Sequence, residues 1–179
     1  MKAQISSERF VIRSLSPEVD EVKFYLTWMQ NKIANPFIQG INENLSSQEL
    51  TDYISQKNDS ETALLLGIFV KTENLHIGNV KLEPIIPKQS ATIGILIGEE
   101  SWRGKGVGFE VITRVLEYCF LDLELELVDL GVNKKNLRAI HLNTLLGFIE
   151  NAQERRSDES IRMSISKSTL RTKLSPDFK

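Results

Sequence analysis

Hydrophobic and polar positions alternate along several short stretches of the chain, as expected for β-strands with one buried face. This pattern, or a short apolar run, predicts strands at residues 9–15, 62–71, 76–85, 91–98, 124–132 and 160–166. The stretch ATIGILIG at 91–98 is apolar at most positions, so we expect it to be buried on both faces. The turn TENL before residue 76 indicates a β-hairpin.

Between these strands, apolar residues at helical spacing predict four helices. They cover residues 20–32, about 47–56, about 106–120 and 136–147. Ser46 and Glu49 form the sequence pattern of a capping box at the start of the second helix. The early strands follow one another directly, whereas the late strands alternate with helices. The chain is therefore predicted to form an α/β or α+β domain with a single sheet.

Composition and charge restrict the possible functions. The 179 residues fit one domain, which we place at 1–167 with a frayed tail at 168–179. The net charge of -2 predicts no general attraction to nucleic acid or to a membrane surface, so any anion site must be local. Cys119 is the only cysteine, which excludes an internal disulfide and favours a cytoplasmic location. The longest apolar run, 63–70, is too short to span a bilayer.

The stretch GEESWRGKGVGFEV, residues 98–111, carries the clearest chemical signal. Directly after Arg103, glycines alternate with other residues: Gly104, Lys105, Gly106, Val107 and Gly108. Glycines adopt positive φ and allow close approach to the backbone, and the start of the helix that follows attracts anions. The spacing excludes a Walker A loop (G-x-x-x-x-G-K-[ST]) and a dinucleotide fingerprint (G-x-G-x-x-G). A flexible turn without a ligand is the simplest alternative.

Two motifs resemble those of the GCN5-related N-acetyltransferases (GNATs). RGKGVG matches the R/Q-x-x-G-x-G/A signature of that family, and VNKKNLRAIHLNTLLGF resembles its next segment, V-x-x-x-N-x-x-A followed by G-F. The matching positions are Val132, Asn136, Ala139, Gly147 and Phe148. The resemblance extends over residues 9–165. IGEESWRGKGVGFEVI looks most like the subgroup that acetylates ribosomal-protein N-termini, the ribosomal-protein-alanine acetyltransferases, and its relatives that act on amino sugars.

The resemblance implies a fold and a cosubstrate. The fold would be a mixed, mostly antiparallel sheet of about six or seven strands, flanked by helices, with a splayed central strand pair. The cosubstrate would be acetyl-CoA, with its pantetheine arm along the backbone of Leu96, Ile97 and Gly98. The loop from Arg103 to Gly108 would hold the pyrophosphate. Asn136 would bond the cosubstrate through its side chain, although a helix N-cap is the alternative role for it.

At the position of a common catalytic acid, the chain departs from the family. Many members place a Tyr four residues after the Ala of the second motif, where this chain has Asn143. Asn143 cannot act as an acid, but it can hydrogen-bond the sulfur of the departing thiolate. Because a thiol has a pKa of about 8.5, a thiolate is only modestly unstable near neutral pH, and water can protonate it.

A general base is needed because the acceptor amine is protonated at neutral pH. With a pKa of about 10, a primary amine costs about 4 kcal/mol to deprotonate at pH 7. Glu83, at the end of a predicted strand near the cleft, is our first candidate for the base. Glu99, Glu100 and His141 are alternatives, and any of the four can instead be a solvated surface group. His76 lies at a predicted hairpin turn, and we leave it out.

The acceptor is predicted to enter beside the first two helices. YLTWMQNKIANPFIQG, residues 25–40, looks like the W-L-N-D-P-type segment of amino-sugar and protein-N-terminal acetyltransferases. Trp28, Asn35 and Phe37 are therefore candidates to line the acceptor pocket. The alternative role of the two aromatic residues is to fill the core.

Together these features predict an acetyl-CoA-dependent N-acetyltransferase. The acetyl group would pass directly, in a ternary complex, to a primary amine of a small molecule, such as a nucleotide-linked amino sugar, or of a protein N-terminus. The alternative is a catalytically weak domain that binds CoA as a sensor. We expect no nucleic acid, membrane or metal partner, and a homodimer stays open.

Overall fold

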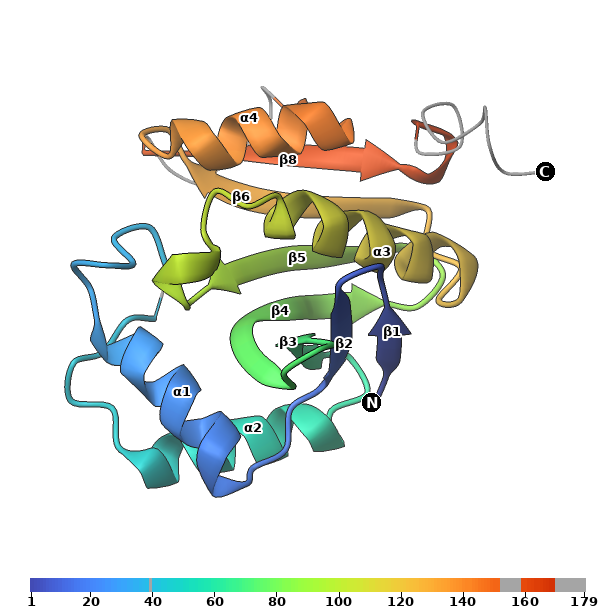
Figure 1. Cartoon of the computed structure of the whole chain (residues 1–179). Helices are drawn as coiled ribbons and strands as arrows, with labels where there is room; N and C mark the ends of the chain where they lie inside the picture. The colour runs from blue at the N-terminus through green and yellow to red at the C-terminus, as the bar shows by residue number, and fades with distance from the viewer. Residues whose placement is uncertain (39, 152–158, 170–179) are drawn as a thin grey trace.

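The computed structural model describes residues 1–38, 40–151 and 159–169 (Figure 1). Within them, one eight-stranded sheet has the order β1-β2-β3-β4-β5-β6-β8-β7. Its strands are β1 (Gln4–Ser6), β2 (Phe10–Ser14), β3 (Leu64–Val70), β4 (Leu75–Ile86), β5 (Ser90–Ile97), β6 (Leu127–Asn133), β7 (Ile149–Glu150) and β8 (Ser160–Ser166). The helices are α1 (Val19–Gln30), α2 (Ser47–Asp59), the 3-10 turn η1 (Glu100–Trp102), α3 (Val107–Leu121) and α4 (Leu137–Leu146). β5 and β6 are parallel and the other neighbouring strands described are antiparallel, which confirms the predicted fold class.

The number of strands corrects the prediction. The described residues form eight strands where about six or seven were expected. The strands missed by the sequence pattern are β1 and β7, of three and two residues, at the two edges of the sheet. Such short stretches cannot show an alternation of apolar and polar positions. The predicted tail begins as a helical turn, in which Thr169 bonds Ser166, and its residues 170–179 lie outside the described part.

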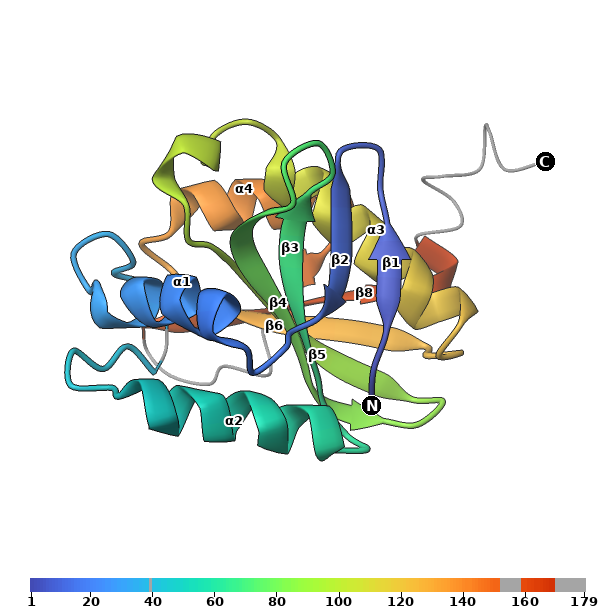
Figure 2. The same ribbon diagram turned by 60° about the horizontal axis from the view of Figure 1, so that its bottom comes forward.

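Helices cover both faces of the sheet (Figure 2). α3 and α4 pack on one face, where Leu116 and Phe120 of α3 join a core that includes Leu82. α1 and α2 pack on the other face, where Trp28 and Ile54 join a second core. No helix in the described part of the chain is long and apolar enough to cross a membrane.

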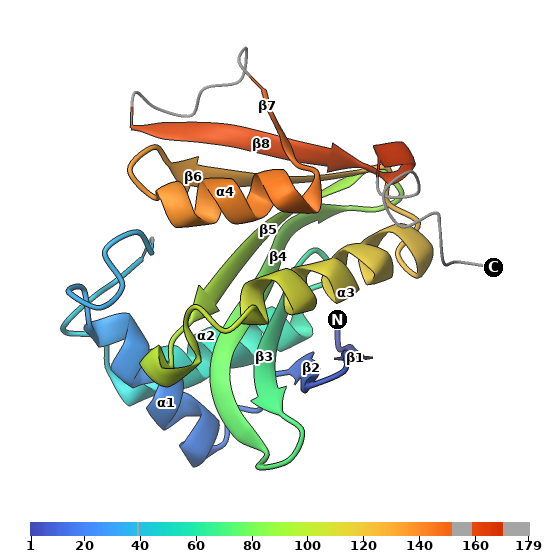
Figure 3. The same ribbon diagram turned by 45° about the horizontal axis from the view of Figure 1, so that its top comes forward.

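β5 and β6 pair over a short length and then separate. Their register runs from Ser90 opposite Leu127 to Thr92 opposite Asp129 and stops there. β5 continues to Ile97, still paired with β4 on its other side. Figure 3 shows the two ribbons side by side at one end and apart toward the end that carries α1. The predicted splayed strand pair is therefore confirmed, and β6 leaves one backbone edge of β5 unpaired beyond Thr92.

Candidate functional site

The glycine loop forms the N-terminus of α3, beside the open end of the strand pair. Gly104 and Gly106 have φ angles of 73° and 75°, and Gly106 is the N-cap of the helix. The first turn closes with the bond from Glu110 N–H to Gly106 C=O, so the N–H groups of the preceding helical residues point out of the helix. A Cβ built on Gly104 meets nothing within 4 Å. Free amides, positive φ and open space fit a bound pyrophosphate.

Arg9, which precedes β2, holds this loop in place. Its backbone N–H and Nε donate to the carboxylate of Glu110 at 2.8 and 2.7 Å, and its Nη1 donates to Lys105 C=O at 3.1 Å. Partial burial alone would raise the pKa of Glu110, but the bonds from Arg9 and Ser7 outweigh it and lower that pKa. Glu110 is therefore ionised, and Arg9 offsets its charge near the anion site. No local sequence pattern indicates this contact, because the two partners lie 101 residues apart.

The side chain of Arg103 contacts the end of β5 and the loop after α1. Its guanidinium donates to Ile97 C=O at 2.9 Å and to Gly98 C=O at 3.1 Å, both at the end of β5. It also donates to Ala34 C=O at 2.9 Å and to Asn35 Oδ1 at 2.8 Å, in the loop after α1. The side chain thus joins the acceptor-side loop to the end of the open strand, and its charge is directed away from the glycine loop. The expectation that Arg103 helps to hold the pyrophosphate, as part of the loop to Gly108, stays a prediction.

We expect Arg103 and Asn35 to be energetically coupled. Arg103→Met should lower the free energy of unfolding by about 1–3 kcal/mol, because it leaves the buried Asn35 Oδ1 without a donor. Asn35→Ala should cost a similar amount, and the double variant should cost less than the two together. Urea unfolding of the four proteins measures the cycle. Strictly additive losses would show that the pair does not interact.

Trp28 and Asn35 are buried and support the residues that form the site. Trp28 is only 6 % exposed, and a Cβ built on Gly98 would lie 1.9 Å from its ring. Asn35 is buried and donates through Nδ2 to Trp28 C=O at 3.0 Å. Trp28 therefore fills the core, which was the alternative role for it. Position 98 requires a glycine because the indole ring lies against it. Phe37, 41 % exposed, is accessible to an acceptor, and its role there stays a prediction.

His76, which we left out as a hairpin-turn residue, is buried on the α1 side of β4. Its ring contacts Trp28 edge-on at 4.9 Å and stacks on Phe69 at 4.8 Å between centroids. Its Nε2 lies 2.8 Å from Asn79 Oδ1 and 3.0 Å from Gly78 C=O. Nε2 therefore carries a proton, because both neighbours are acceptors. Burial lowers the pKa of His76, more than its bonds raise it, so the ring is neutral.

This buried imidazole predicts a pH dependence of stability. His76 has a lowered pKa when folded, whereas the unfolded chain binds the proton at about pH 6.5. Protons therefore favour the unfolded state, and stability falls as the pH drops below about 6.5. His76→Gln should flatten the slope of unfolding free energy between about pH 7.5 and 5.5. The control His141→Gln, at an exposed position, should keep the wild-type slope. Equal slopes in the three proteins would contradict the assignment.

Glu83 is held in ion pairs. Its carboxylate lies 2.5 Å from Lys57 Nζ and 3.3 Å from Lys81 Nζ. Partial burial alone would raise the pKa of Glu83, but the bonds and charges of the two lysines outweigh it and lower that pKa. These contacts do not test Glu83 as the general base, and that role stays a prediction. Among the alternatives, Glu99 bonds Ser101 Oγ at 3.0 Å.

The two asparagines of the second motif lie on α4. Asn136 is its N-cap and accepts from Ala139 N–H at 3.1 Å, so the N-cap alternative is present. That bond uses Oδ1 and leaves Nδ2 for a cosubstrate. Asn143 is buried on the same helix. Its predicted bond to a thiolate sulfur stays a prediction.

Gly108 has a different role from the other loop glycines. It lies within α3, and a Cβ built on it would be 2.9 Å from Leu142 Cδ2 of α4. Its φ is not positive, unlike that of Gly104 or Gly106. Packing of α3 against α4 therefore explains this glycine, and only its backbone N–H can contribute to the anion site. This corrects the expectation that Gly108 adopts a positive φ, and its place beside the phosphate stays a prediction.

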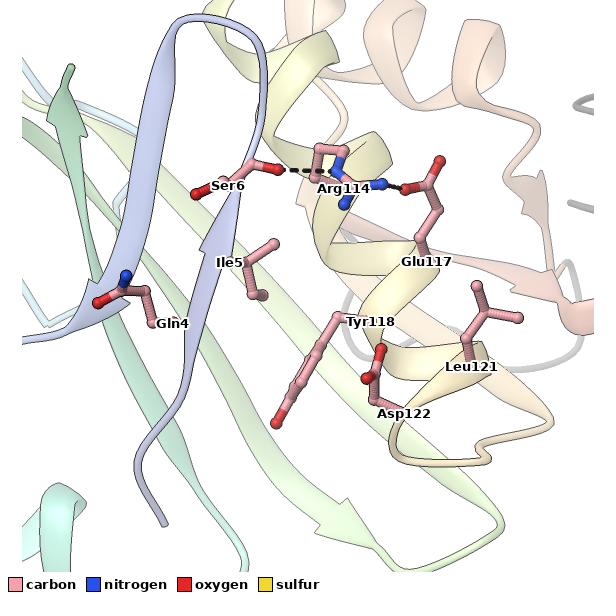
Figure 4. Close-up of a pocket in the computed structure, with 8 residues that line it drawn as sticks. All are labelled: Gln4, Ile5, Ser6, Arg114, Glu117, Tyr118, Leu121 and Asp122. Atoms are coloured by element: carbon pink, nitrogen blue, oxygen red, sulfur yellow. Dashed lines mark hydrogen bonds and ion pairs between the residues drawn. The ribbon is translucent and has the colours of Figure 1, made fainter. Parts of the chain in front are cut away.

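A separate pocket of about 270 Å³ lies between edge strand β1 and the last half of α3 (Figure 4). Arg114 Nε donates to Ser6 C=O at 3.0 Å there, and Arg114 also pairs with Glu117. The glycine loop is at the opposite end of the same helix. This pocket is therefore not part of the candidate site.

Comparison with known proteins assigns the family. The sequence profile of the acetyltransferase (GNAT) domain matches residues 9–149. The probable N-acetyltransferase YjcK of Bacillus subtilis is 29% identical over 103 residues, 56% of either chain, so the match spans little more than half of that relative.

Solved structures share the fold. Spermidine N-acetyltransferase of Vibrio cholerae, in complex with CoA and spermine, is 24% identical, with a TM-score of 0.77 over 90% of this chain and 98% of that one. RimL, a ribosomal alpha-N-protein acetyltransferase in complex with CoA, is 14% identical, with a TM-score of 0.76 over 92% and 98%. A GNAT acetyltransferase of Bacillus anthracis is 13% identical, with a TM-score of 0.77 over 93% and 99%. The chain therefore belongs to the GNAT acetyltransferase family, whose cosubstrate is acetyl-CoA.

Proposed function

We propose that this protein is an N-acetyltransferase that moves an acetyl group from acetyl-CoA to a primary amine. The observation that carries the proposal is the glycine loop beside the open end of β5. Arg103 ties the two together through its bonds to Ile97 and Gly98. An anion site and an unpaired strand edge, held next to each other, suit a ligand with a pyrophosphate and an amide-containing arm.

The residues that would hold acetyl-CoA follow from this geometry. The backbone N–H groups from Gly104 to Gly108 and the exposed Lys105 would bind the pyrophosphate. Leu96 to Gly98 would pair with the pantetheine arm, and Asn136 would donate through Nδ2. When bound, acetyl-CoA supplies a thioester with an electrophilic carbonyl carbon. Asn143 would stabilise the departing sulfur by a hydrogen bond.

Direct transfer, without an acyl-enzyme, is supported by the state of Cys119. This thiol is fully buried in the core between α3 and the sheet. Burial raises the pKa of Cys119 to about 12, so it is not a nucleophile at neutral pH. Cys119→Ala should keep near-wild-type kcat/KM for acetyl-CoA in a thiol-release assay. An inactive but folded Cys119→Ala protein would overturn direct transfer.

The acceptor we favour is a protein N-terminus or an amino sugar. On the α2 side of the sheet, two lysines surround Glu83, and Arg162 pairs with Asp129 at 2.8 Å. These contacts neutralise Glu83 and Asp129, so neither carboxylate offers an unpaired charge to a polycation such as spermidine. The single buried cysteine supports a cytoplasmic location.

A CoA-binding sensor is the second candidate, because Asn143 replaces the common acid. Thiol release from acetyl-CoA, with mass spectrometry of the product, separates the two functions. The panel consists of spermidine, glucosamine and peptides that begin with free Ala or Ser. An enzyme releases thiol only with an accepted amine and yields its acetylated form. A sensor binds acetyl-CoA by calorimetry and releases thiol with none of them.

A further inference from the structure

Polar side chains meet where β5 leaves β6. Thr92 and Asp129 are the last residues of the register between the two strands. Thr92 Oγ1 donates to Asp129 Oδ1 at 3.0 Å, and Arg162 Nη2 on β8 donates to Asp129 Oδ2 at 2.8 Å. Asp129 is only 3 % exposed. A buried carboxylate, oriented by two donors, therefore lies where β5 and β6 begin to separate.

This carboxylate lies on the side of the sheet that carries α1 and α2. Val128 and Leu130, its neighbours along β6, belong to the core beneath α3 and α4. Because side chains alternate between the two faces of a strand, Asp129 points to the opposite face. Leu96 on β5 packs against Trp28 of α1, which places Thr92 on that same face by the same alternation. The acceptor is proposed to approach from this face.

Both strands place a glycine just beyond the Thr92–Asp129 pair. Gly94 lies two residues after Thr92, and Gly131 lies two residues after Asp129, so both are on the same face as the pair. Both are exposed, and a Cβ built on Gly94 meets nothing within 4 Å. The diverging strands therefore leave space free of side chains directly beside the carboxylate.

We propose that Asp129 is the proton acceptor for the amine substrate, an inference that rests on the proposed N-acetyltransferase function. The amine would occupy the space beside Gly94 and Gly131, with Asp129 at its closed end. Thr92 and Arg162 are positioning residues that fix the two carboxylate oxygens. Glu83, held by Lys57 and Lys81 on the same side, balances the local charge.

The reaction then balances as follows. The ammonium group gives one proton to the Asp129 carboxylate, and the neutral nitrogen attacks the thioester carbon with its lone pair. A C–N bond forms and the C–S bond breaks, and the sulfur leaves with the bonding electron pair. The new amide nitrogen loses its extra proton, the thiolate gains one to become CoA, and Asp129 returns its proton to solvent. One proton is released per turnover, and no oxidant or reductant is needed.

Asp129→Asn tests this role with little change in shape. The assay uses the panel amine with the fastest thiol release, across about pH 6.5 to 9.5. We expect kcat/KM at about pH 7 to fall about 100-fold or more, with the loss recovering about tenfold per pH unit toward the pKa of the amine. The Kd for acetyl-CoA should change less than about threefold. Asp122→Asn, the same change at the far end of α3, is the matched control and should keep the wild-type profile.

Two further variants separate a catalytic role from a structural one. Thr92→Val keeps the Arg162 ion pair and removes the bond that orients one carboxylate oxygen, so kcat/KM at about pH 7 should fall by a smaller factor than in Asp129→Asn and recover in the same way at high pH. This variant decides the question if Asp129→Asn does not fold. Glu83→Gln should lower kcat/KM without the recovery at high pH.

The outcomes are distinguishable. An active wild type with a pH-independent loss in Asp129→Asn, or with unchanged kcat/KM in Thr92→Val, overturns the role of Asp129 alone. High-pH recovery in Glu83→Gln, with no effect of Asp129→Asn, would assign the base to Glu83. No thiol release by the wild type with any panel amine, despite acetyl-CoA binding, overturns the proposed function and the role of Asp129 together.

Discussion

Gly106→Val is expected to weaken acetyl-CoA binding by about 100-fold or more, which corresponds to about 2.7 kcal/mol. Gly106 is the N-cap of α3 with a φ of 75°, a conformation that a β-branched residue resists. A valine there would turn the backbone away and place its side chain among the amides proposed to bind pyrophosphate. Isothermal titration calorimetry of acetyl-CoA measures the effect, with circular dichroism to confirm that the variant is folded.

Gly40→Val is the matched control for this change. Gly40 has a φ of 81° in the loop after α1, and a Cβ built on it comes no closer than 3.9 Å to another residue. The control therefore carries the same backbone strain away from the glycine loop, and it should keep wild-type affinity for acetyl-CoA. If Gly106→Val binds acetyl-CoA with micromolar affinity, equal to that of Gly40→Val, the assignment of the glycine loop as an anion site is contradicted.

Gly98→Ala should lower the free energy of unfolding by about 3 kcal/mol or more. The new Cβ would lie 1.9, 2.3 and 2.4 Å from three carbons of the Trp28 ring, which is itself buried. Because the ring is also packed against His76, it cannot move away without disturbing the core beneath α1. Urea unfolding measures the loss.

Gly94→Ala is the control for the overpacking effect. It adds the same methyl group to the same strand, where nothing lies within 4 Å, and should change stability by less than about 1 kcal/mol. In a Trp28→Leu background, Gly98→Ala should cost less than in the wild type, because the smaller side chain leaves room for the new methyl group. Equal losses in Gly98→Ala and Gly94→Ala would show that the indole is not the cause.

Local signals in the sequence predicted the regular elements well. The last strand, 160–166, coincides with β8, and the capping box at Ser46 is present, with Glu49 N–H donating to Ser46 Oγ at 3.2 Å. These features depend on residues close in sequence. β1 was missed because three residues carry too little pattern, although its pairing with β2 is regular.

The candidate site likewise has features that could be predicted from the sequence and features that could not. The glycine loop could be predicted because its positive φ angles and the helix that follows are properties of one short stretch. The directions of side chains could not be predicted, because they depend on distant partners. Arg103 reaches Asn35, 68 residues away, and Asp129 is held by Thr92 and Arg162 from two other strands. Only the folded chain brings these groups together.

The central claim is that the glycine loop and the open strand pair form the acetyl-CoA site. A crystal structure of the wild-type protein with acetyl-CoA tests it most directly. We predict pyrophosphate oxygens at about 3 Å from the backbone N–H groups between Gly104 and Gly108, and the pantetheine arm along β5 beyond Thr92. Acetyl-CoA bound elsewhere, with this loop and strand edge free of ligand, would contradict the account.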